Sequence, residues 1–341
     1  MQYSSIPTCY FPTTALFLDD SRDFLLNFVL QLDEGVAYRI FDAPYSALNY
    51  IHKKNGELDL LSHLRLGEFT QSNHAPVTND AASLDLAAIH TEVYNPHRFA
   101  EISVVVVDYA MPGMDGLEFC RRIENPNVKK ILLTGQADEK LAIAAFNEGL
   151  IHRYIKKSDP NAADLITKSI YELQFQYFQG MSDAILRMLA MTAPTCLQDK
   201  KFARFFHELR ANYGVVEYYL IDQSGGFLLL DEDANVSFLL VKAEEELAAG
   251  YQVALDSGAS KDVLAQLASG EKIPMPVKGS LTGVQGRDWD ALLITATEVV
   301  GDKSYYYAYS NDHVLLDLRQ QKILSYHRYL EELDAEELLV G

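Results

Sequence analysis

Cysteine is scarce in this 341-residue chain, and the few that occur are far apart. Cys9, Cys120 and Cys196 are an odd number, and no CxxC pair occurs. Because a disulfide framework needs paired cysteines, this distribution predicts reduced thiols, as in a cytoplasmic protein.

Long apolar runs and positive charge are also in short supply. No stretch approaches the roughly eighteen apolar residues that a membrane span requires. The first residues, MQYSSIPTCYF, lack the basic region and the apolar core of a secretory signal. Lysine and arginine number 29 against 48 acids, and the net charge of -19 repels phosphate backbones and anionic lipid. We therefore expect a cytoplasmic protein without a membrane or nucleic-acid partner.

What the chain does have, over residues 14–160, is an alternation of short apolar runs with helical patterns. Repeated β/α units of this kind predict an α/β fold with a parallel sheet and helices on both faces. The four valines Val104–Val107 are typical of a strand that is buried on both sides. The expected strands are residues 14–20, 36–42, 103–108, 128–135 and 152–157.

Residues 54–100 interrupt this alternation. The segment is mostly polar and too long for an ordinary connection, so we expect an insertion between the second helix and the third strand, with a short helix near 82–90. Five of the nine histidines lie in or beside it. Their spacing is irregular and no HxxxH pair occurs, which favours a surface loop over a metal site.

Acidic residues stand at the ends of two expected strands. Asp19 and Asp20 end the first, and Asp108 ends the third. In a doubly wound sheet of strand order 2-1-3-4-5 these strands are neighbours, and their carboxyl ends flank the place where ligands bind. Clustered carboxylates repel one another unless a cation neutralises them, and an oxygen-only cluster suits Mg²⁺. Taken alone, Asp19 is better explained as a helix N-cap and Asp115 as a turn residue. The prediction of a metal site therefore depends on several such residues occurring together at neighbouring strand ends.

Two further strand ends add a hydroxyl and an ammonium group. Thr134 closes the fourth strand, and Lys156 and Lys157 close the fifth. Carboxylates with a metal, a hydroxyl and a lysine suit a phosphoryl group. Because the chain has no GxxxxGK[ST] or kinase-type glycine loop, we expect the phosphoryl group to be carried on the protein itself, with Asp108 as the nucleophile.

Four motifs occupy these strand ends in order: LFLDDS, DYAMPGMDG, ILLTGQAD and FNEGLIHRYIKK. Through them, residues 14–160 resemble the CheY-like receiver domain of bacterial response regulators. The resemblance implies that a sensor histidine kinase or a phosphotransfer protein phosphorylates the chain, with Mg²⁺ as cofactor. The implied site consists of the phospho-acceptor Asp108, the metal ligands Asp20, Asp19 (through water), Asp108 and the carbonyl of Ala110, and phosphoryl contacts from Thr134 and a lysine.

The spacing within the last motif indicates which of the two lysines contacts the phosphoryl group. The family's usual ending is an aromatic residue, two further residues, lysine and proline. Tyr154 and Lys157 keep this spacing, although Ser158 stands where proline is usual. We therefore expect Lys157, rather than Lys156, to contact the phosphoryl group. Tyr154 is expected to be either a mobile switch residue acting with Thr134 or an ordinary half-buried strand tyrosine.

Beyond residue 160 the pattern changes. A helical segment over 161–195 has a wide apolar side, which suits packing against a second copy or within its own chain. Two hairpin patterns and several helices then predict an α+β domain on an antiparallel sheet over 196–341. We thus expect a receiver domain over 1–160, a helical linker over 161–195 for which dimerisation and packing within the chain are both open, and an output domain of unknown type over 196–341.

No motif identifies what the second half does. It has no helix-turn-helix with a basic recognition helix and no GGDEF-like, HD-GYP-like or kinase-like motif. The first hypothesis is a phosphorylation-controlled switch without enzymatic output, which acts through protein–protein contact or homodimerisation. The alternatives are a receiver-gated ligand- or nucleotide-binding domain, enzymatic or not, and a DNA-binding regulator with an unrecognised fold. The whole chain also resembles two-domain response regulators of quorum sensing, which implies a role in that kind of signalling.

Overall fold

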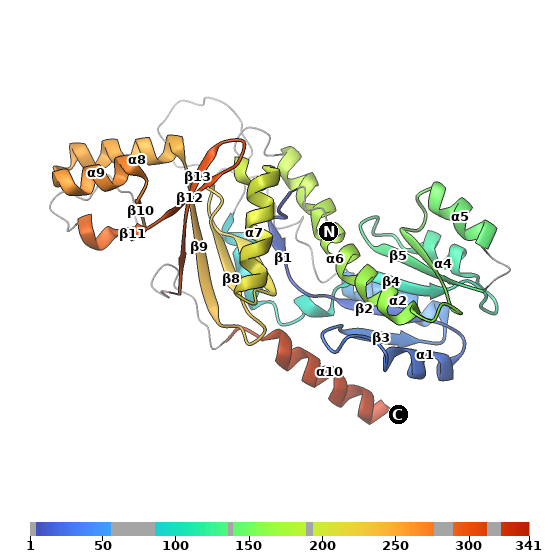
Figure 1. The fold of residues 1–341 in the computed structure, drawn as a ribbon. Helices are drawn as coiled ribbons and strands as arrows, with labels where there is room; N and C mark the ends of the chain where they lie inside the picture. The colour runs from blue at the N-terminus through green and yellow to red at the C-terminus, as the bar shows by residue number, and fades with distance from the viewer. Residues whose placement is uncertain are drawn as a thin grey trace, which may run out of the picture. The chain divides into compact units, whose positions relative to one another are not determined.

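A computed structural model describes most of the chain, coloured in Figure 1. The described residues are 5–55, 86–135, 139–188, 194–275, 289–311 and 322–340. Contacts divide the chain into two compact units. One consists of Phe11–His63, Asn95–Ala184 and Tyr326–Gly341, and the other of Met1–Tyr10, Leu64–Tyr94 and Ile185–Ser325. We call them the parallel-sheet unit and the antiparallel-sheet unit.

The parallel-sheet unit is built on five strands in the spatial order β3-β2-β4-β5-β6. They are β2 (Thr14–Leu18), β3 (Tyr38–Phe41), β4 (Ile102–Asp108), β5 (Lys129–Thr134) and β6 (Arg153–Lys156). This is the 2-1-3-4-5 order of a CheY-like doubly wound fold, as predicted. Every residue of β4 is buried, and Val107 pairs with Leu18 of β2. The valine run is therefore a central strand, which confirms the prediction.

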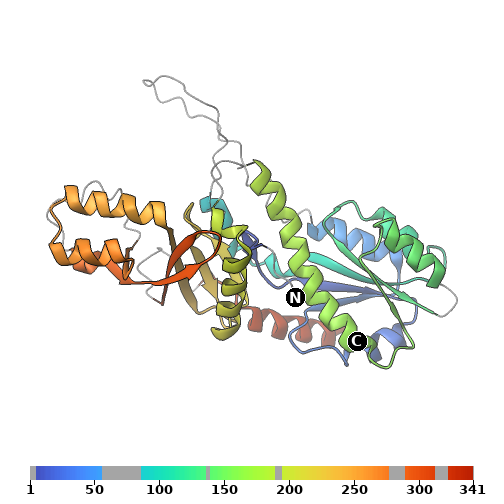
Figure 2. The ribbon, with the colours of Figure 1, turned by 45° about the horizontal axis from the view of Figure 1, so that its top comes forward.

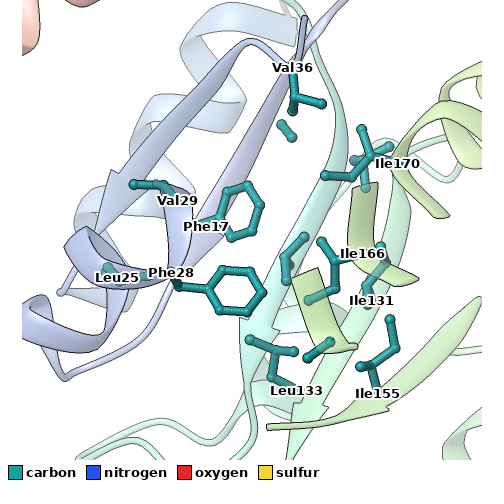
Figure 3. Close-up of a cluster of buried hydrophobic side chains, with 14 of the residues drawn as sticks. Phe17, Leu25, Phe28, Val29, Val36, Ile131, Leu133, Ile155, Ile166 and Ile170 are labelled. Atoms are coloured by element: carbon teal, nitrogen blue, oxygen red, sulfur yellow. The ribbon is translucent and has the colours of Figure 1, made fainter. Parts of the chain in front are cut away.

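Helices cover both faces of this sheet. One face carries α1 (Arg22–Val29) and α6 (Ala162–Met188), and the long α6 can be followed across the sheet in Figure 2. The apolar cluster beneath these two helices, drawn in Figure 3, includes Phe17, Leu25, Phe28, Ile131, Leu133, Ile166 and Ile170. The other face carries α2 (Pro44–Asn55), α4 (Gly116–Arg122) and α5 (Glu139–Asn147), with Leu117 and Ala142 packed against Leu132.

The apolar side of α6 packs within its own unit. Ile166, Ile170 and Leu173 are completely buried, and the hydroxyl of Tyr171 donates a hydrogen bond to Asp33 Oδ1 at 2.6 Å. These contacts support packing within the chain, one of the two expectations for this helix. Over this stretch the buried side of α6 is thus occupied by contacts within its own unit.

The antiparallel-sheet unit contains a six-stranded sheet in the order β1-β7-β8-β9-β13-β12. Its strands are β1 (Cys9–Tyr10), β7 (Glu217–Leu220), β8 (Phe227–Leu230), β9 (Val236–Ala243), β12 (Thr297–Val300) and β13 (Ser304–Ser310). The two predicted hairpins are confirmed as β7–β8 and β12–β13. Helix α7 (Lys200–Asn212) packs on one face, where Phe206 contacts Tyr218 and Phe202 contacts Tyr305.

A small subdomain extends this second unit. Helices α8 (Glu244–Asp256) and α9 (Lys261–Ser269) lie side by side in both Figure 1 and Figure 2. The two-stranded sheet of β10 (Lys272–Pro274) and β11 (Leu293–Thr295) lies beside them, with Trp289 in the shared apolar cluster. None of the described helices in either unit has the length and apolar character of a membrane span.

The two ends of the chain depart from a simple order of consecutive domains. Strand β1 pairs with β7, so the first residues belong to the antiparallel-sheet unit. Helix α10 (Tyr326–Val340) belongs to the parallel-sheet unit. There Tyr326 Oη donates a hydrogen bond to the carbonyl of Gly35 at 2.8 Å, and Tyr329 Oη lies 2.7 Å from Thr14 Oγ1. Each unit is thus completed by a segment from the far end of the sequence.

The structure describes only part of the predicted insertion. Helix α3 (Leu86–Thr91) overlaps the short helix expected near 82–90, and it contacts β7 of the antiparallel-sheet unit. The remainder of the insertion, residues 56–85, lies outside the described residues.

His152, which follows α5, gives the parallel-sheet unit one pH dependence. Its Nδ1 accepts a hydrogen bond from the backbone N–H of Lys130 at 3.2 Å, which requires a neutral ring. Burial, followed by the charges of Lys129, Lys130 and Arg153, lowers the pKa of His152 to about 4. The unfolded chain takes up this proton near its ordinary pKa of about 6.5. The contribution of His152 to stability is therefore complete above that pH and is lost as the pH falls toward 4.

Replacing His152 with Asn keeps a hydrogen-bond acceptor but removes this titration. Between about pH 7.5 and about pH 5.5, we expect the wild type to lose about 1 kcal/mol more free energy of unfolding than His152→Asn. Urea denaturation at the two pH values measures the difference. His97→Asn, at an exposed histidine, is the matched control. Between the two pH values it should lose as much free energy of unfolding as the wild type does. If His152→Asn loses as much free energy of unfolding as the wild type, the pH dependence does not come from His152.

Candidate functional site

The predicted acidic residues meet at the carboxyl ends of β2 and β4. Asp19 and Asp20 directly follow β2, and Asp108 is the last residue of β4. Because these strands are neighbours, one carboxylate oxygen from each of the three residues lies within 4.8 Å of the others. Asp19 and Asp108 are buried, whereas Asp20 is exposed. The three residues thus form an acidic cluster in which two carboxylates are shielded from water and one is exposed.

A short turn fixes Asp19 relative to α1. Asp19 Oδ1 accepts a hydrogen bond from the backbone N–H of Ser21 at 2.9 Å. Ser21 Oγ in turn accepts one from the backbone N–H of Phe24 at 3.3 Å, which makes Ser21 the N-cap of α1. Asp19 is therefore not the helix cap, and its Oδ2 faces the other site residues.

The loop after Asp108 returns closely onto β4. The backbone N–H of Gly116 donates a hydrogen bond to the Tyr109 carbonyl at 3.0 Å, and Asp115 Oδ1 caps α4 by accepting one from Glu118 at 2.8 Å. A Cβ atom at Gly116 would overlap the carbonyl oxygen of Asp108, so this approach requires glycine. The loop therefore holds the start of α4 against Asp108.

Lys157 links two of the carboxylates. Its Nζ lies 2.6 Å from Asp19 Oδ2 and 2.8 Å from Asp108 Oδ1. Lys156 instead pairs with Glu139 Oε2 at 3.0 Å. The structure therefore places Lys157, and not its neighbour, in the acidic cluster.

Burial and ion pairing act in opposite directions on these groups. Burial raises the pKa of Asp19, although hydrogen bonds from Lys157 and Ser21 oppose the increase. Burial alone would lower the pKa of Lys157, but hydrogen bonds to Asp108 and Asp19 raise it overall. The ammonium group thus stays charged and compensates for two carboxylates that are shielded from water.

Thr134 adds a hydroxyl group at the end of β5. The residue is 1% exposed, and within the described part of the chain its Oγ1 has no hydrogen-bond partner. A buried hydroxyl without a partner costs about 1–3 kcal/mol, so such a group in a native site calls for a ligand or a water. Thr134 is therefore suited to a ligand oxygen.

The donor set fits Mg²⁺. Mg²⁺ prefers oxygen ligands, takes one or two carboxylates and keeps several waters, which matches two buried acids beside an exposed one. Burial raises the pKa of Asp19, so a cation at this cluster would relieve an electrostatic cost. Ala110 lies two residues beyond Asp108, and the role of its carbonyl as a further ligand stays a prediction.

Two aromatic residues complete the description of the site, one of them predicted and the other not. Tyr154 of β6 is half-buried, and its ring packs edge-on against Phe146 of α5 with 6.4 Å between the ring centroids. Its role as a switch residue stays a prediction. The sequence patterns did not single out Phe24, whose ring centroid lies 4.7 Å from Lys157 Nζ. An apolar residue in the first turn of an amphipathic helix is usually a core residue, so no sequence signal distinguished it.

A protein family and a solved structure match this chain. The family model described as "Response regulator receiver domain" matches residues 74–169, which contain Asp108, Thr134 and Lys157. The solved structure of the Legionella pneumophila response regulator LqsR is 60% identical, with a TM-score of 0.85, and the match covers 100% of both chains. This chain belongs to the response regulator family. Its parallel-sheet unit is a receiver domain, and the protein is a two-component response regulator.

Curated relatives of this response regulator match only part of it. The C4-dicarboxylate transport transcriptional regulatory protein DctD of Rhizobium meliloti is 33% identical over 134 residues, which are 38% of this chain and 25% of DctD. The cyclic di-GMP phosphodiesterase response regulator RpfG of Xanthomonas campestris is 33% identical over 79 residues, which are 22% of this chain and 21% of RpfG. The chain spans a quarter or less of these two relatives.

Proposed function

We propose that this response regulator accepts a phosphoryl group on Asp108, with Mg²⁺ held by Asp19, Asp20 and Asp108. One observation carries the proposal: the Lys157 ammonium group lies within 2.8 Å of both Asp19 and Asp108, and Asp108 is only 5% exposed. A fixed cation that is shielded from water stabilises negative charge arriving beside it. The phosphoryl group would bring that charge to Asp108.

The transfer needs one oxygen of the Asp108 carboxylate. This oxygen attacks phosphorus, the bond between phosphorus and the donor breaks, and the donor leaves with the electron pair. The proposed donor is a phosphohistidine on a sensor histidine kinase or a phosphotransfer protein. Mg²⁺ supplies positive charge for the phosphoryl oxygens when it is bound. Lys157 and the Thr134 hydroxyl then donate hydrogen bonds to these oxygens.

Removal of the metal tests this proposal. With a small acyl phosphate as donor, we expect labelling of the protein in Mg²⁺ and at least about a tenfold slower rate in EDTA, because the carboxylate cluster then lacks its neutralising cation. Radiolabel incorporation over time gives the rate, and restoring Mg²⁺ to the EDTA sample is the control. Equal rates in Mg²⁺ and in EDTA would count against the proposed metal site.

Phosphorylation is proposed to act on the side of the receiver that carries α5 and β6. Thr134 ends β5 just before the connection to α5, and Tyr154 packs against Phe146 of α5. Movement of the Thr134 hydroxyl toward the phosphoryl oxygens would shift this connection and change the packing of Tyr154. We therefore assign the switch to Thr134 and Tyr154.

The exposed side of α5 is the surface proposed for output. Leu141, Ile143 and Phe146 are 48%, 41% and 43% exposed. Exposed large apolar side chains on one helix suit contact with another protein. We propose that the phosphorylated protein forms a homodimer through this surface, in cytoplasmic quorum-sensing signalling. The antiparallel-sheet unit would then pass on the signal by protein contact rather than by catalysis.

Replacing Phe146 with Asp is expected to prevent this dimerisation. Light scattering should show that labelled wild-type protein doubles in mass while labelled Phe146→Asp stays monomeric, because the charge would be buried at an apolar contact. Leu255→Asp, at a leucine of α8 that is 45% exposed, is the matched control and should dimerise like the wild type. A monomeric mass for labelled wild type would overturn the dimer proposal and leave phosphoryl acceptance intact.

A further inference from the structure

The ammonium group of Lys157 has a third neighbour besides its two carboxylates. The ring centroid of Phe24 lies 4.7 Å from Lys157 Nζ, within the distance at which an aromatic face attracts a cation. Asp19 and Asp108 contact the same nitrogen at 2.6 Å and 2.8 Å. Lys157 is therefore held by two acids and one ring, and its side chain stays 28% exposed.

The ring of Phe24 is well anchored. Its backbone N–H donates to Ser21 Oγ, and the backbone N–H of Ser21 donates to Asp19 Oδ1, so one turn sets the positions of both the ring and the acid. The ring also stacks on Phe28, with 5.4 Å between the centroids, and Phe28 packs on Phe17 in the buried core. Phe24 is thus positioned from the backbone and from the core at once.

The ring differs from the carboxylates in one respect that matters for the reaction. Asp19 and Asp108 are also the candidate Mg²⁺ ligands, and a carboxylate that is bound to a metal is a weaker partner for an ammonium group. Asp108 in addition changes its charge when it becomes an acyl phosphate. The face of Phe24 binds neither metal nor phosphoryl oxygen, so of the three described contacts of the Lys157 ammonium group it is the one that these changes leave intact.

We propose that Phe24 is a positioning residue, whose ring holds the Lys157 ammonium group beside Asp108 while the carboxylates exchange partners. This inference rests on the proposed phosphoryl acceptance by Asp108. It assigns a role to an apolar residue, whereas the site residues described so far are polar. A ring that only filled space in the core would support α1 equally well whether or not a cation lay above it. If Phe24 positions Lys157, the effect of replacing Phe24 on the labelling rate depends on the presence of Lys157. If Phe24 only fills space in the core, that effect is the same with and without Lys157.

A double-mutant cycle separates these roles. With an acyl phosphate and Mg²⁺, we expect Phe24→Leu to slow labelling about three- to tenfold, and Phe24→Tyr, which keeps an aromatic face, to stay within about twofold of wild type. In a Lys157→Met background, Phe24→Leu should cause no further loss. A loss of the same size in both backgrounds, or no loss in either, would overturn the proposal. Thermal unfolding of each variant confirms that the labelled proteins are folded.

A second readout needs neither metal nor phosphoryl donor. In the metal-free protein, the face of the Phe24 ring should shift the Lys157 Cε proton resonances upfield, and Phe24→Leu should abolish that shift while Phe24→Tyr retains it. Resonances that are unchanged in Phe24→Leu would overturn the contact itself. Absence of labelling in every protein, wild type included, would instead refute phosphoryl acceptance, so the two failures can be told apart.

Discussion

Asp108→Asn is expected to slow labelling by an acyl phosphate by a factor of at least about 100, because the amide offers no anionic oxygen to attack phosphorus. The substitution conserves the shape of a residue that ends the buried strand β4. It leaves Asp19 to pair with Lys157, so the fold should survive. The loss should therefore be in the rate of labelling rather than in the amount of folded protein, which circular dichroism checks.

Asp115→Asn is the matched control for this result. Asp115 lies in the same loop, where its Oδ1 caps α4 by accepting a hydrogen bond from Glu118, and Asn caps helices about as well as Asp. It should therefore label like the wild type. A similar loss in both variants would mean that the loop, rather than the Asp108 carboxylate, is what labelling requires.

Lys157→Met is expected to lower the free energy of unfolding by about 2–3 kcal/mol in metal-free buffer, because breaking an ion pair leaves buried charge without compensation. The side chains of Asp19 and Asp108 are 1% and 6% exposed, and Lys157 is the cation that both contact. Its loss leaves two neighbouring carboxylates that repel one another. Urea denaturation in the presence of EDTA measures the effect.

Mg²⁺ should restore much of the stability of Lys157→Met, since the metal then supplies the charge that the lysine no longer provides. Lys156→Met is the matched control, because Lys156 pairs with the surface residue Glu139 at 3.0 Å. Such exposed pairs contribute about 0–1 kcal/mol, so this control should change little and should not respond to Mg²⁺ differently from the wild type. A Lys157→Met protein as stable as wild type in EDTA would show that the ion pairs of Lys157 do not compensate the buried acids.

Much of the receiver could be predicted because its strands and its polar residues obey strong local rules. A run such as Val104–Val107 is typical of a strand covered on both faces, and parallel strands bring their carboxyl ends to one edge. These two rules bring Asp19 and Asp108 together without any structural information. Spacing from Tyr154 also selected Lys157, which the structure places between the two acids.

What could not be predicted depends on contacts between distant segments. The short strand at Cys9–Tyr10 carries no signal for the sheet it joins, and the final helix Tyr326–Val340 has no pattern that assigns it to the receiver. Pairing with β7 in one case and hydrogen bonds from Tyr326 and Tyr329 in the other decide these positions. The contact between Phe24 and Lys157 is of the same kind, because it joins residues more than 130 positions apart.

The position of the phosphoryl group itself tests the central claim most directly. An acyl phosphate on aspartate is reduced by borohydride to an alcohol, whereas a phosphate ester on serine or threonine is not. Peptide mapping of protein that has been labelled in Mg²⁺ and then reduced should therefore find one converted residue, Asp108. Conversion at Asp19 or Asp20, or label that survives reduction on a hydroxyl residue, would contradict the assignment of Asp108 as the phosphoryl acceptor.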